Sequence, residues 1–210
     1  MKRPRILLAD DHPMVLEGIY KVLAQDYEIV GTVADGRALV EAALHLKPDL
    51  IVVDVAMPFL NGIDATIQIK RSLPGMKVLF FTMQSSTAYV MAALEAGGTG
   101  YVLKSSAIEE LRDTVQRVLS GRIHVSPSIS TEALERFQDP ARAAATFRLS
   151  VRERETLQLI AQGMTAKEIA HLMNISAKTV GFHRENIKRK LGVRTIAEFT
   201  KYAIEQGMIP

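Results

Sequence analysis

Three aspartates stand directly after short apolar runs near the start of the chain. Asp10 and Asp11 follow the run Ile6–Ala9, and Asp54 follows the run Leu50–Val53. If both runs are strands of one parallel sheet, the three carboxylates meet at one edge of it, where they repel one another unless a cation offsets their charge. Carboxylate oxygens are the ligands that Mg²⁺ prefers, so the group predicts a magnesium site. Any one of these aspartates alone is more typical of the turn that follows a strand.

A hydroxyl and an ammonium group occupy two further predicted strand ends. Thr82 closes the run Lys77–Thr82, and Lys104 directly follows the run Gly100–Leu103. Alone, each residue has an ordinary explanation, as a strand-end threonine or a solvated lysine. Beside the aspartates and Mg²⁺, they would bind the oxygens of a phosphoryl group, which an aspartate carboxylate can accept covalently. Together the five residues predict a phosphoacceptor site.

These side chains need a scaffold in which parallel strands alternate with helices. Five short runs rich in β-branched residues predict the strands Arg5–Ala9, Glu28–Val33, Leu50–Val53, Lys77–Thr82 and Gly100–Leu103. Apolar residues with helical spacing lie between them and predict helices around Leu16–Leu23, Leu39–Leu46, Ile63–Leu73, Ala88–Ala96 and Ile108–Leu119. This alternation predicts an α/β fold, with a five-stranded parallel sheet that is covered by helices on both faces.

The character of the chain changes after residue 125. The segment 126–146 contains Pro127, Pro140 and an Ala/Arg-rich run, which predicts a linker with one short helix near Ile129–Phe137. Residues 1–125 carry 13 basic and 14 acidic side chains, whereas residues 147–210 carry 11 basic and 6 acidic ones, a net charge of +5. A basic segment beside a nearly neutral one favours a polyanionic partner for the basic part.

Residues 147–210 are patterned as helices whose starts are marked by capping residues. The capping pairs or residues are Ser150 with Glu153, Thr165 with Glu168, and Ser176. A turn at residues 173–175 separates a helix at 166–172 from a longer one that ends at Leu191. Two helices joined in this way predict a helix-turn-helix, in which the second helix lies in the major groove of DNA.

The second of these helices has one apolar and one largely charged face. Counting about 100° per residue places Val180, Ile187 and Leu191 together, and Lys178, Phe182, Glu185 and Arg189 opposite them. We expect Lys178, Lys188 and Arg189 near phosphates or base edges, although an ordinary hairpin with a solvated basic face is the alternative. Glu185 can accept a hydrogen bond from a cytosine amino group or pair with Arg189, and we favour the pairing.

Residues 1–125 resemble the receiver domain of two-component response regulators. The matching stretches are Asp10-Asp11-His12-Pro13, Asp54 with Met57-Pro58 and Gly62, Thr82, and Gly100-Tyr101-Val102-Leu103-Lys104. The resemblance implies flavodoxin-like strand order and Asp54 as the phosphoacceptor. It further implies Mg²⁺ ligation by Asp10, Asp11, Asp54 and the backbone carbonyl of Ala56, phosphoryl binding by Thr82 and Lys104, and Tyr101 as the switch residue. Movement of Thr82 toward the phosphoryl group would open space that Tyr101 can fill.

Residues 148–210 resemble the LuxR-type helix-turn-helix of the NarL/FixJ regulators. The matching stretches are Leu149-Ser150, Arg152-Glu153-Arg154-Glu155, Gly163 to Thr165, Lys167-Glu168-Ile169-Ala170, Ile175-Ser176, Lys178-Thr179-Val180, His183 and Lys190-Leu191. The candidate DNA contacts are Lys178, Thr179, Phe182, His183, Arg184, Glu185, Lys188 and Arg189. Gly181 and Glu185 depart from the family pattern where bases would be read. The last helix, 196–206, either contributes to dimerisation or closes the core of this small domain.

The combined prediction is a cytoplasmic DNA-binding response regulator with a receiver domain at 1–125, a linker at 126–146 and a helix-turn-helix domain at 147–210. A sensor histidine kinase would phosphorylate Asp54, and phosphorylation would control homodimerisation and promoter binding. The chain has no cysteine and no apolar run long enough to cross a bilayer, so we expect no disulfide and no membrane partner.

Two alternatives have different biochemical functions. A phosphohydrolase with Asp54 as its nucleophile would need a carboxylate acid/base close after that residue, but Ala56 stands there and Asp64 lies too far along. We therefore expect no turnover enzyme. The other alternative is a DNA-binding regulator whose receiver only dimerises and whose activity is independent of phosphorylation.

Overall fold

The computed structural model describes residues 3–85, 87–106, 108–127, 129, 149–205 and 208–209. The chain divides into two compact units, residues 1–143 and 144–210. Apart from Ile129, the short helix predicted near Ile129–Phe137 lies outside the described residues, as do most of the predicted linker and the predicted start of the second domain at residue 147.

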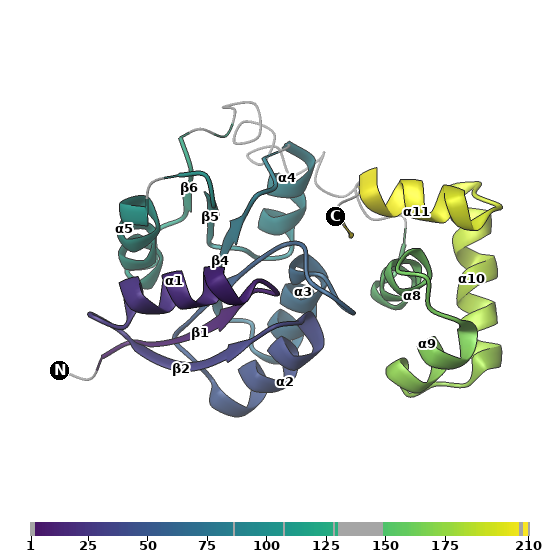
Figure 1. The fold of residues 1–210 in the computed structure, drawn as a ribbon, viewed down its shortest axis with the longest axis horizontal. Helices are drawn as coiled ribbons and strands as arrows, with labels where there is room; N and C mark the ends of the chain where they lie inside the picture. The colour runs from purple at the N-terminus through teal and green to yellow at the C-terminus, as the bar shows by residue number, and fades with distance from the viewer. Residues whose placement is uncertain are drawn as a thin grey trace. The chain divides into compact units, whose positions relative to one another are not determined.

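The first unit is built on a parallel sheet with the strand order β2-β1-β3-β4-β5-β6 (Figure 1). The strands are β1 Arg5–Ala9, β2 Glu28–Val33, β3 Leu50–Val53, β4 Lys77–Thr82, β5 Gly100–Leu103 and β6 His124–Val125. The prediction of a parallel flavodoxin-like sheet is confirmed, and β6 adds a short strand to the five expected. Because β6 has only two residues, it has no alternating pattern that a sequence could reveal.

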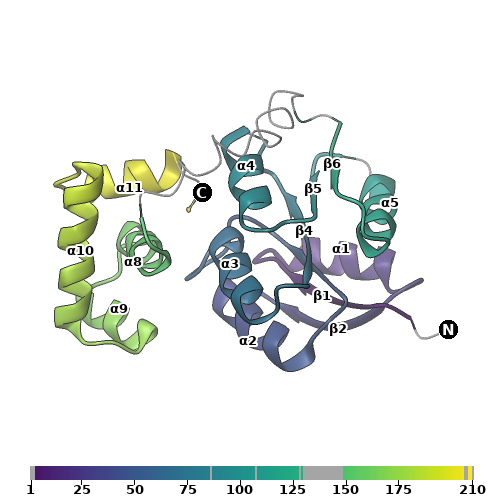
Figure 2. The ribbon, with the colours of Figure 1, turned by 180° about the vertical axis from the view of Figure 1, so that it is seen from behind.

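Helices cover both faces of this sheet. They are α1 Pro13–Leu23, α2 Gly36–Leu46, α3 Gly62–Ser72, α4 Thr87–Glu95 and α5 Ile108–Leu119. Figures 1 and 2 show α1 and α5 on one face and α2, α3 and α4 on the other. Successive residues of β1 point to opposite faces of the sheet. Ile6 and Leu8 pack in the core under α1 and α5, and Leu7 and Ala9 pack in the core on the other face. Each strand is thus fixed from both sides.

The second unit contains four helices in its described residues, and the first three begin where the capping residues predict. The helices are α8 Val151–Ala161, α9 Ala166–Met173, α10 Ala177–Leu191 and α11 Ile196–Glu205. Both capping boxes form, and the Ser176 side chain accepts a hydrogen bond from the Thr179 N–H. Asn174 ends α9 in the left-handed conformation, with φ of 53°, so the chain turns at once into α10. The predicted helix-turn-helix is confirmed.

The packing of the first unit continues beyond residue 125. The Ser126 N–H donates to the carbonyl of Tyr101 at 2.8 Å, and Ser126 is fully buried. Ile129 is also buried, in the core that contains Tyr101. The described part of the predicted linker therefore begins as an extension of the sheet.

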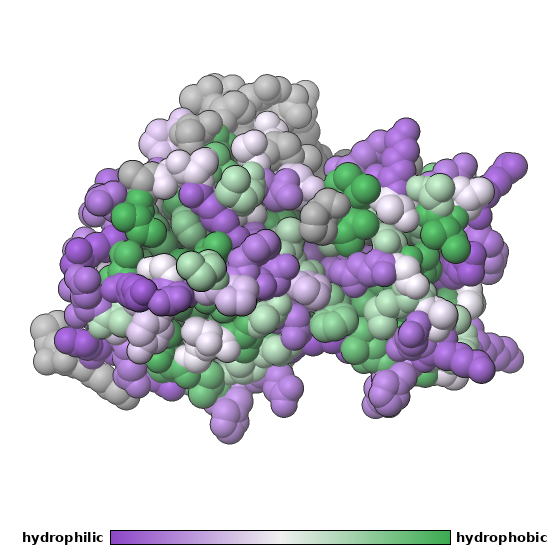
Figure 3. Space-filling model, viewed as in Figure 1, coloured by the Kyte–Doolittle hydropathy of each residue, from purple (hydrophilic) through white to green (hydrophobic). Residues whose placement is uncertain are grey.

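The face of the molecule drawn in Figure 3 carries many polar side chains. Hydrophilic side chains cover much of the face drawn in Figure 3, and hydrophobic ones show there only in separate groups. Among the described residues, none of the helices has the length and apolar character needed to cross a membrane.

Gly62 brings the start of α3 against the backbone of Asp54. Its N–H donates to the Val55 carbonyl at 2.9 Å, and the preceding Asn61 caps α3 by accepting from the Asp64 N–H. A Cβ atom at Gly62 would lie 2.0 Å from the carbonyl oxygen of Asp54. Backbone atoms cannot rotate away as a flexible side chain can, so only glycine allows this approach.

We expect Gly62→Ala to destabilise the protein, by about 1–3 kcal/mol, because overpacking against a rigid backbone forces a helix or loop to shift. Gly18→Ala is the matched control, since a Cβ at that position in α1 meets nothing within 4 Å. It should raise stability by up to about 1 kcal/mol through helix propensity. Urea unfolding of both variants measures these changes in the free energy of unfolding, which should have opposite signs. A Gly62→Ala protein as stable as its parent would contradict the close approach.

Candidate functional site

The predicted acidic residues meet at the carboxyl edge of the sheet. Backbone hydrogen bonds continue past the strand ends, since the Asp10 N–H donates to the Val33 carbonyl and the Asp54 N–H donates to the Ala9 carbonyl, at 3.1 and 2.9 Å. The Lys104 N–H donates to the Thr82 carbonyl at 2.8 Å. These bonds hold the ends of neighbouring strands at the same level, and they position the side chains that follow.

Lys104 forms the electrostatic centre of this edge. Its Nζ lies 2.6 Å from Asp10 Oδ2 and 2.6 Å from Asp54 Oδ2, and its side chain is only 9% exposed. Burial alone would lower the pKa of Lys104, but its hydrogen bonds to Asp10 and Asp54 outweigh burial and raise that pKa. Burial raises the pKa of Asp10, and the bond from Lys104 only partly opposes this. One ammonium group thus serves two buried carboxylates.

Four side chains could hold a metal ion at the same edge. Ligand atoms of Asp10, Asp11, His12 and Asp54 all lie within 4.8 Å of one another. The Ala56 N–H donates to Asp54 Oδ1 at 3.4 Å, which places the Ala56 backbone beside this group. Three carboxylates are hard oxygen donors, so the donor set fits a hard divalent cation.

His12 is the member of this group to which the sequence pattern assigned no ligand role. Its Nδ1 lies 2.7 Å from Asp11 Oδ1, and its backbone N–H donates to Asp10 Oδ1 at 2.9 Å. The side chain is 67% exposed. The only sequence signal for a place of His12 in this group is its position between the aspartate pair and Pro13, the first residue of α1. A residue at that point lies close to the end of the preceding strand.

Thr82 and Tyr101 are linked through the loop that follows β4. Thr82 is buried, and its Oγ1 accepts a hydrogen bond from the Gln84 N–H at 3.4 Å. The Tyr101 hydroxyl donates to the Gln84 carbonyl at 2.8 Å, and its ring centroid lies 6.0 Å from that of Phe80. Tyr101 is fully buried, and burial together with the charge of Asp54 raises its pKa. Its ring therefore already fills the interior next to this loop.

The faces of α10 are arranged as predicted. Val180 and Ile187 are buried, whereas Lys178, Phe182 and Arg189 are exposed. The remaining candidate DNA contacts divide into exposed Glu185 and the half-buried residues Thr179, His183, Arg184 and Lys188. The outer face of this helix is free of packing against the core of its unit.

The expected pairing of Glu185 with Arg189 is wrong. Glu185 instead accepts a hydrogen bond from Lys188 at 2.7 Å, and Arg189 donates to Asn186 at 2.9 Å. Both bonds span three residues rather than four. Helix geometry permits both spacings, so the sequence alone could not choose between them.

An ion pair that sequence reasoning missed fastens α10 to α8. Lys190 Nζ lies 2.6 Å from Glu153 Oε2, and the same oxygen accepts from the Ser150 N–H at 2.7 Å. Burial would raise the pKa of Glu153, but the bonds from Lys190 and Ser150 outweigh it and hold that pKa below its usual value. No local pattern signals this contact, because the partners are 37 residues apart.

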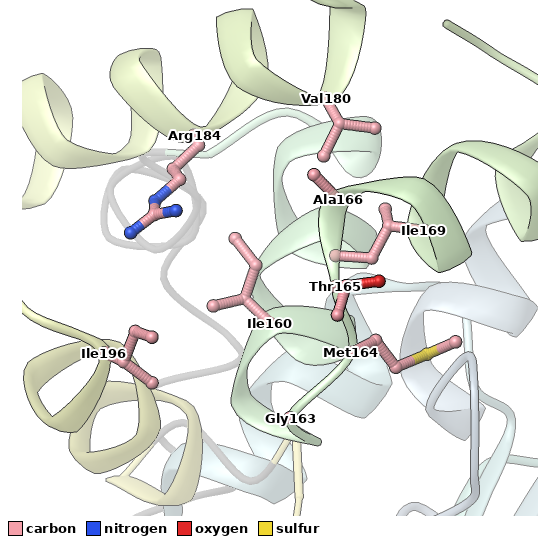
Figure 4. A pocket seen from close by; sticks show the side chains of 9 residues that line it. All are labelled: Ile160, Gly163, Met164, Thr165, Ala166, Ile169, Val180, Arg184 and Ile196. Carbon is pink, nitrogen blue, oxygen red and sulfur yellow. The ribbon is translucent and has the colours of Figure 1, made fainter. Parts of the chain in front are cut away.

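Arg184 differs from the other candidate DNA contacts because it lines a pocket within the second unit. The pocket has a volume of about 230 Å³, and apolar side chains including Ile160, Ile169 and Ile196 form much of its wall (Figure 4). Arg184 Nε is buried and has no hydrogen-bond partner among the described residues. The guanidinium group thus lies between the helices of its unit rather than on the outermost face of α10.

An acidic pocket of this kind at the edge of a flavodoxin-like sheet, followed by a helix-turn-helix, is the architecture of a two-domain transcription regulator. Comparisons with known proteins agree with it. Residues 6–116 match the response regulator receiver domain, and residues 148–203 match the LuxR family of bacterial regulatory proteins. Both resemblances stated from the sequence are confirmed.

Relatives and solved structures extend this match over the whole chain. The transcriptional regulatory protein MctR of Rhizobium johnstonii is 33% identical, with 98% of this chain and 95% of MctR covered. The oxygen regulatory protein NreC of Staphylococcus aureus is 35% identical, over 98% of this chain and 99% of NreC. A structure of the RcsB response regulator from Salmonella typhimurium has 30% identity and a TM-score of 0.65, over 98% of this chain and 99% of RcsB. The chain therefore belongs to the response regulators that carry a LuxR-type DNA-binding domain.

Glu153→Gln should destabilise the second unit at pH 7 by about 1–3 kcal/mol. The substitution removes the charge of a buried side chain and so weakens its bonds to Lys190 and to the Ser150 N–H. Since folding lowers the pKa of Glu153, its contribution is present above the usual value of 4.5 and is lost as the pH falls through the lower native value. The difference between parent and variant should therefore shrink below pH 4.5.

The control for this prediction is Glu185→Gln, which removes an exposed pair with Lys188 and should change stability by less than about 1 kcal/mol. Urea unfolding followed by circular dichroism at several pH values measures both variants. Equal effects of the two substitutions at pH 7 would show that the Glu153–Lys190 contact has no special weight.

Proposed function

We propose that phosphorylation of Asp54 switches this chain between two states and thereby controls its binding to DNA. The main support for this proposal is the position of the Lys104 ammonium group, which lies 2.6 Å from a carboxylate oxygen of Asp54 and 2.6 Å from one of Asp10. A cation held there can neutralise charge on a phosphoryl group attached to Asp54, which is the main requirement of phosphoryl transfer. A sensor histidine kinase is the proposed phosphodonor.

In the proposed transfer, an Asp54 carboxylate oxygen attacks the phosphorus atom of a phosphohistidine. A P–O bond forms and the P–N bond breaks, and the departing imidazole nitrogen retains the electron pair and takes up a proton. Asp10, Asp11, Asp54 and the Ala56 carbonyl are proposed to hold Mg²⁺, which supplies positive charge for the phosphoryl oxygens. Lys104 exchanges one carboxylate partner for a phosphoryl oxygen.

Thr82 and Tyr101 are proposed to convert this chemistry into a change of shape. Thr82 Oγ1 accepts a long hydrogen bond from the Gln84 N–H, at 3.4 Å, so a Thr82 side chain that turns to donate its hydroxyl proton to the phosphoryl group would move relative to this loop. The carbonyl of the same Gln84 accepts from Tyr101. The loop after β4 therefore connects the phosphoryl ligand with the buried aromatic ring, and it is the element that we expect to have two positions.

The DNA contacts are proposed to come from α10. Its exposed side chains, Lys178, Phe182, Glu185 and Arg189, are assigned to the major groove, and the half-buried Thr179, His183 and Lys188 to the sugar-phosphate backbone. Arg184 would join them only if its guanidinium group leaves the pocket that it lines. The related RcsB has been solved bound to DNA, and in one structure as two dimers on two DNAs. We infer that this chain likewise binds double-stranded DNA as a homodimer and that it does so in the cytoplasm.

The proposal does not include enzymatic turnover. In a phosphohydrolase, a second carboxylate near Asp54 would act as acid and base, and Asp64 is the nearest one that follows it in the same segment. Asp64 is buried and accepts a hydrogen bond from the Asn61 side chain at 2.9 Å, at the start of α3. Its carboxylate thus stabilises a helix start.

Incubation with a small phosphodonor and Mg²⁺ should add the mass of one phosphoryl group to the native chain and none to Asp54→Ala. The phosphorylated chain should also show a larger dimer fraction and a higher affinity for promoter DNA. Asp26→Asn is the control, because Asp26 is an exposed aspartate paired with Arg112. Native protein that gains no mass would refute the switch, and a gain without change in DNA affinity would favour a phosphorylation-independent regulator.

Mg²⁺ should raise the melting temperature of the unphosphorylated chain, because a ligand that binds only the folded state stabilises it, by about 2.7 kcal/mol at a concentration of 100 Kd. Asp11→Asn removes one proposed ligand and should abolish most of this increase, whereas Asp26→Asn should retain it. Calorimetry in MgCl₂ and in NaCl of equal ionic strength separates binding from screening. An undiminished increase in Asp11→Asn would remove Asp11 from the metal site.

A further inference from the structure

A large aromatic side chain lies exposed in the middle of the outer face of α10. Phe182 is 64% exposed, although aromatic rings of this size are usually buried. It is the sixth residue of a helix that begins at Ala177, and the charged residues Lys178 and Arg189 flank it along the same face. The first turns of a helix in the major groove are those that reach the base edges.

The neighbours of Phe182 leave the ring as the main contact surface of this part of the helix. Gly181 has no side chain, and a Cβ built there meets nothing within 4 Å, so the helix surface beside the ring is open. The Glu185 carboxylate is occupied by Lys188 at 2.7 Å, and the Thr179 hydroxyl forms a 2.8 Å hydrogen bond with Ser176. The middle of the face thus offers an apolar ring and few free hydrogen-bonding groups.

His183 restrains the orientation of this ring. The two ring centroids lie 6.1 Å apart with an interplanar angle of 61°, which is an edge-to-face arrangement. His183 is itself half-buried, so one partner of the pair is anchored in the domain. A restrained ring loses less conformational freedom on binding than a freely rotating one.

We propose that Phe182 recognises the C5 methyl group of a thymine in the major groove. That methyl group is the apolar feature that base pairs present there, and an exposed ring gains most from covering an apolar group. The inference rests on the proposed insertion of α10 into DNA and adds a base preference to it. The ring is a specificity determinant, and the positive charges of Lys178 and Arg189 on the same face also attract the duplex without regard to sequence.

The test begins with selection of duplexes from a randomised library by the full phosphorylated chain. In the enriched duplex, each thymine is replaced singly by deoxyuridine, which removes only the C5 methyl group. Replacement at one position in each half-site should weaken binding by about fourfold, the equivalent of about 0.8 kcal/mol for one buried methyl group. Fluorescence anisotropy measures the affinities.

The variant Phe182→Ala should bind the thymine and deoxyuridine duplexes equally well at that position, whereas Phe182→Leu should keep part of the preference. Because Phe182 is exposed, neither variant is expected to disturb folding, and circular dichroism checks this. A C·G pair placed at the same position should bind more tightly when its cytosine carries a 5-methyl group, and only in the native chain and Phe182→Leu.

The possible failures separate the two proposals. If the native chain binds the selected duplex but tolerates deoxyuridine at every position, the methyl-recognition inference is overturned and DNA binding by α10 stands. The inference is also overturned if Phe182→Ala keeps the full preference for thymine. If the phosphorylated chain enriches no duplex, the proposed DNA-binding function fails, and the inference fails with it.

Discussion

The contact on which the first unit depends most is that of one ammonium group with two buried carboxylates. Two such carboxylates at one sheet edge are costly without a cation, and loss of one partner from a buried pair leaves an uncompensated charge. Lys104 follows β5, and Asp10 and Asp54 follow β1 and β3, so the side-chain contacts tie three strands together. The backbone bond from Lys104 to Thr82 adds β4. A ligand that attracts Lys104 therefore acts on most of the sheet edge at once.

The second unit keeps its core and its proposed DNA-recognition surface on different faces of one helix. Val180 and Ile187 bind α10 into the core, and the Lys190–Glu153 ion pair fastens its end to α8. The opposite face carries Phe182 and contributes nothing to that core. A substitution on the outer face should therefore leave the position of the helix unchanged.

Much of the fold could be predicted because β1 to β5 are short apolar runs, four of which end in or are directly followed by a polar residue, and because capping residues mark three of the helix starts. The same strand ends also revealed the site, since the carboxyl ends of parallel strands share one edge. Contacts that depend on distant parts of the chain could not be read in this way. The Glu153–Lys190 pair joins residues 37 apart, and the choice of Lys188 as partner of Glu185 depends on side-chain rotamers. The strand β6 could not be predicted either, because it has only two residues and is defined by its pairing with β5.

Tyr101 forms hydrogen bonds through both its hydroxyl group and its backbone carbonyl. Its hydroxyl is attached to the carbonyl of Gln84 in the loop after β4, and its own carbonyl accepts the N–H of Ser126, where the chain leaves the sheet. Ser126 is further held by a hydrogen bond from its side chain to Glu110 on α5. Ser126 is therefore attached to both β5 and α5. A shift of Tyr101, which lies beside the loop after β4, would therefore also displace Ser126 and with it the point at which the chain leaves the sheet.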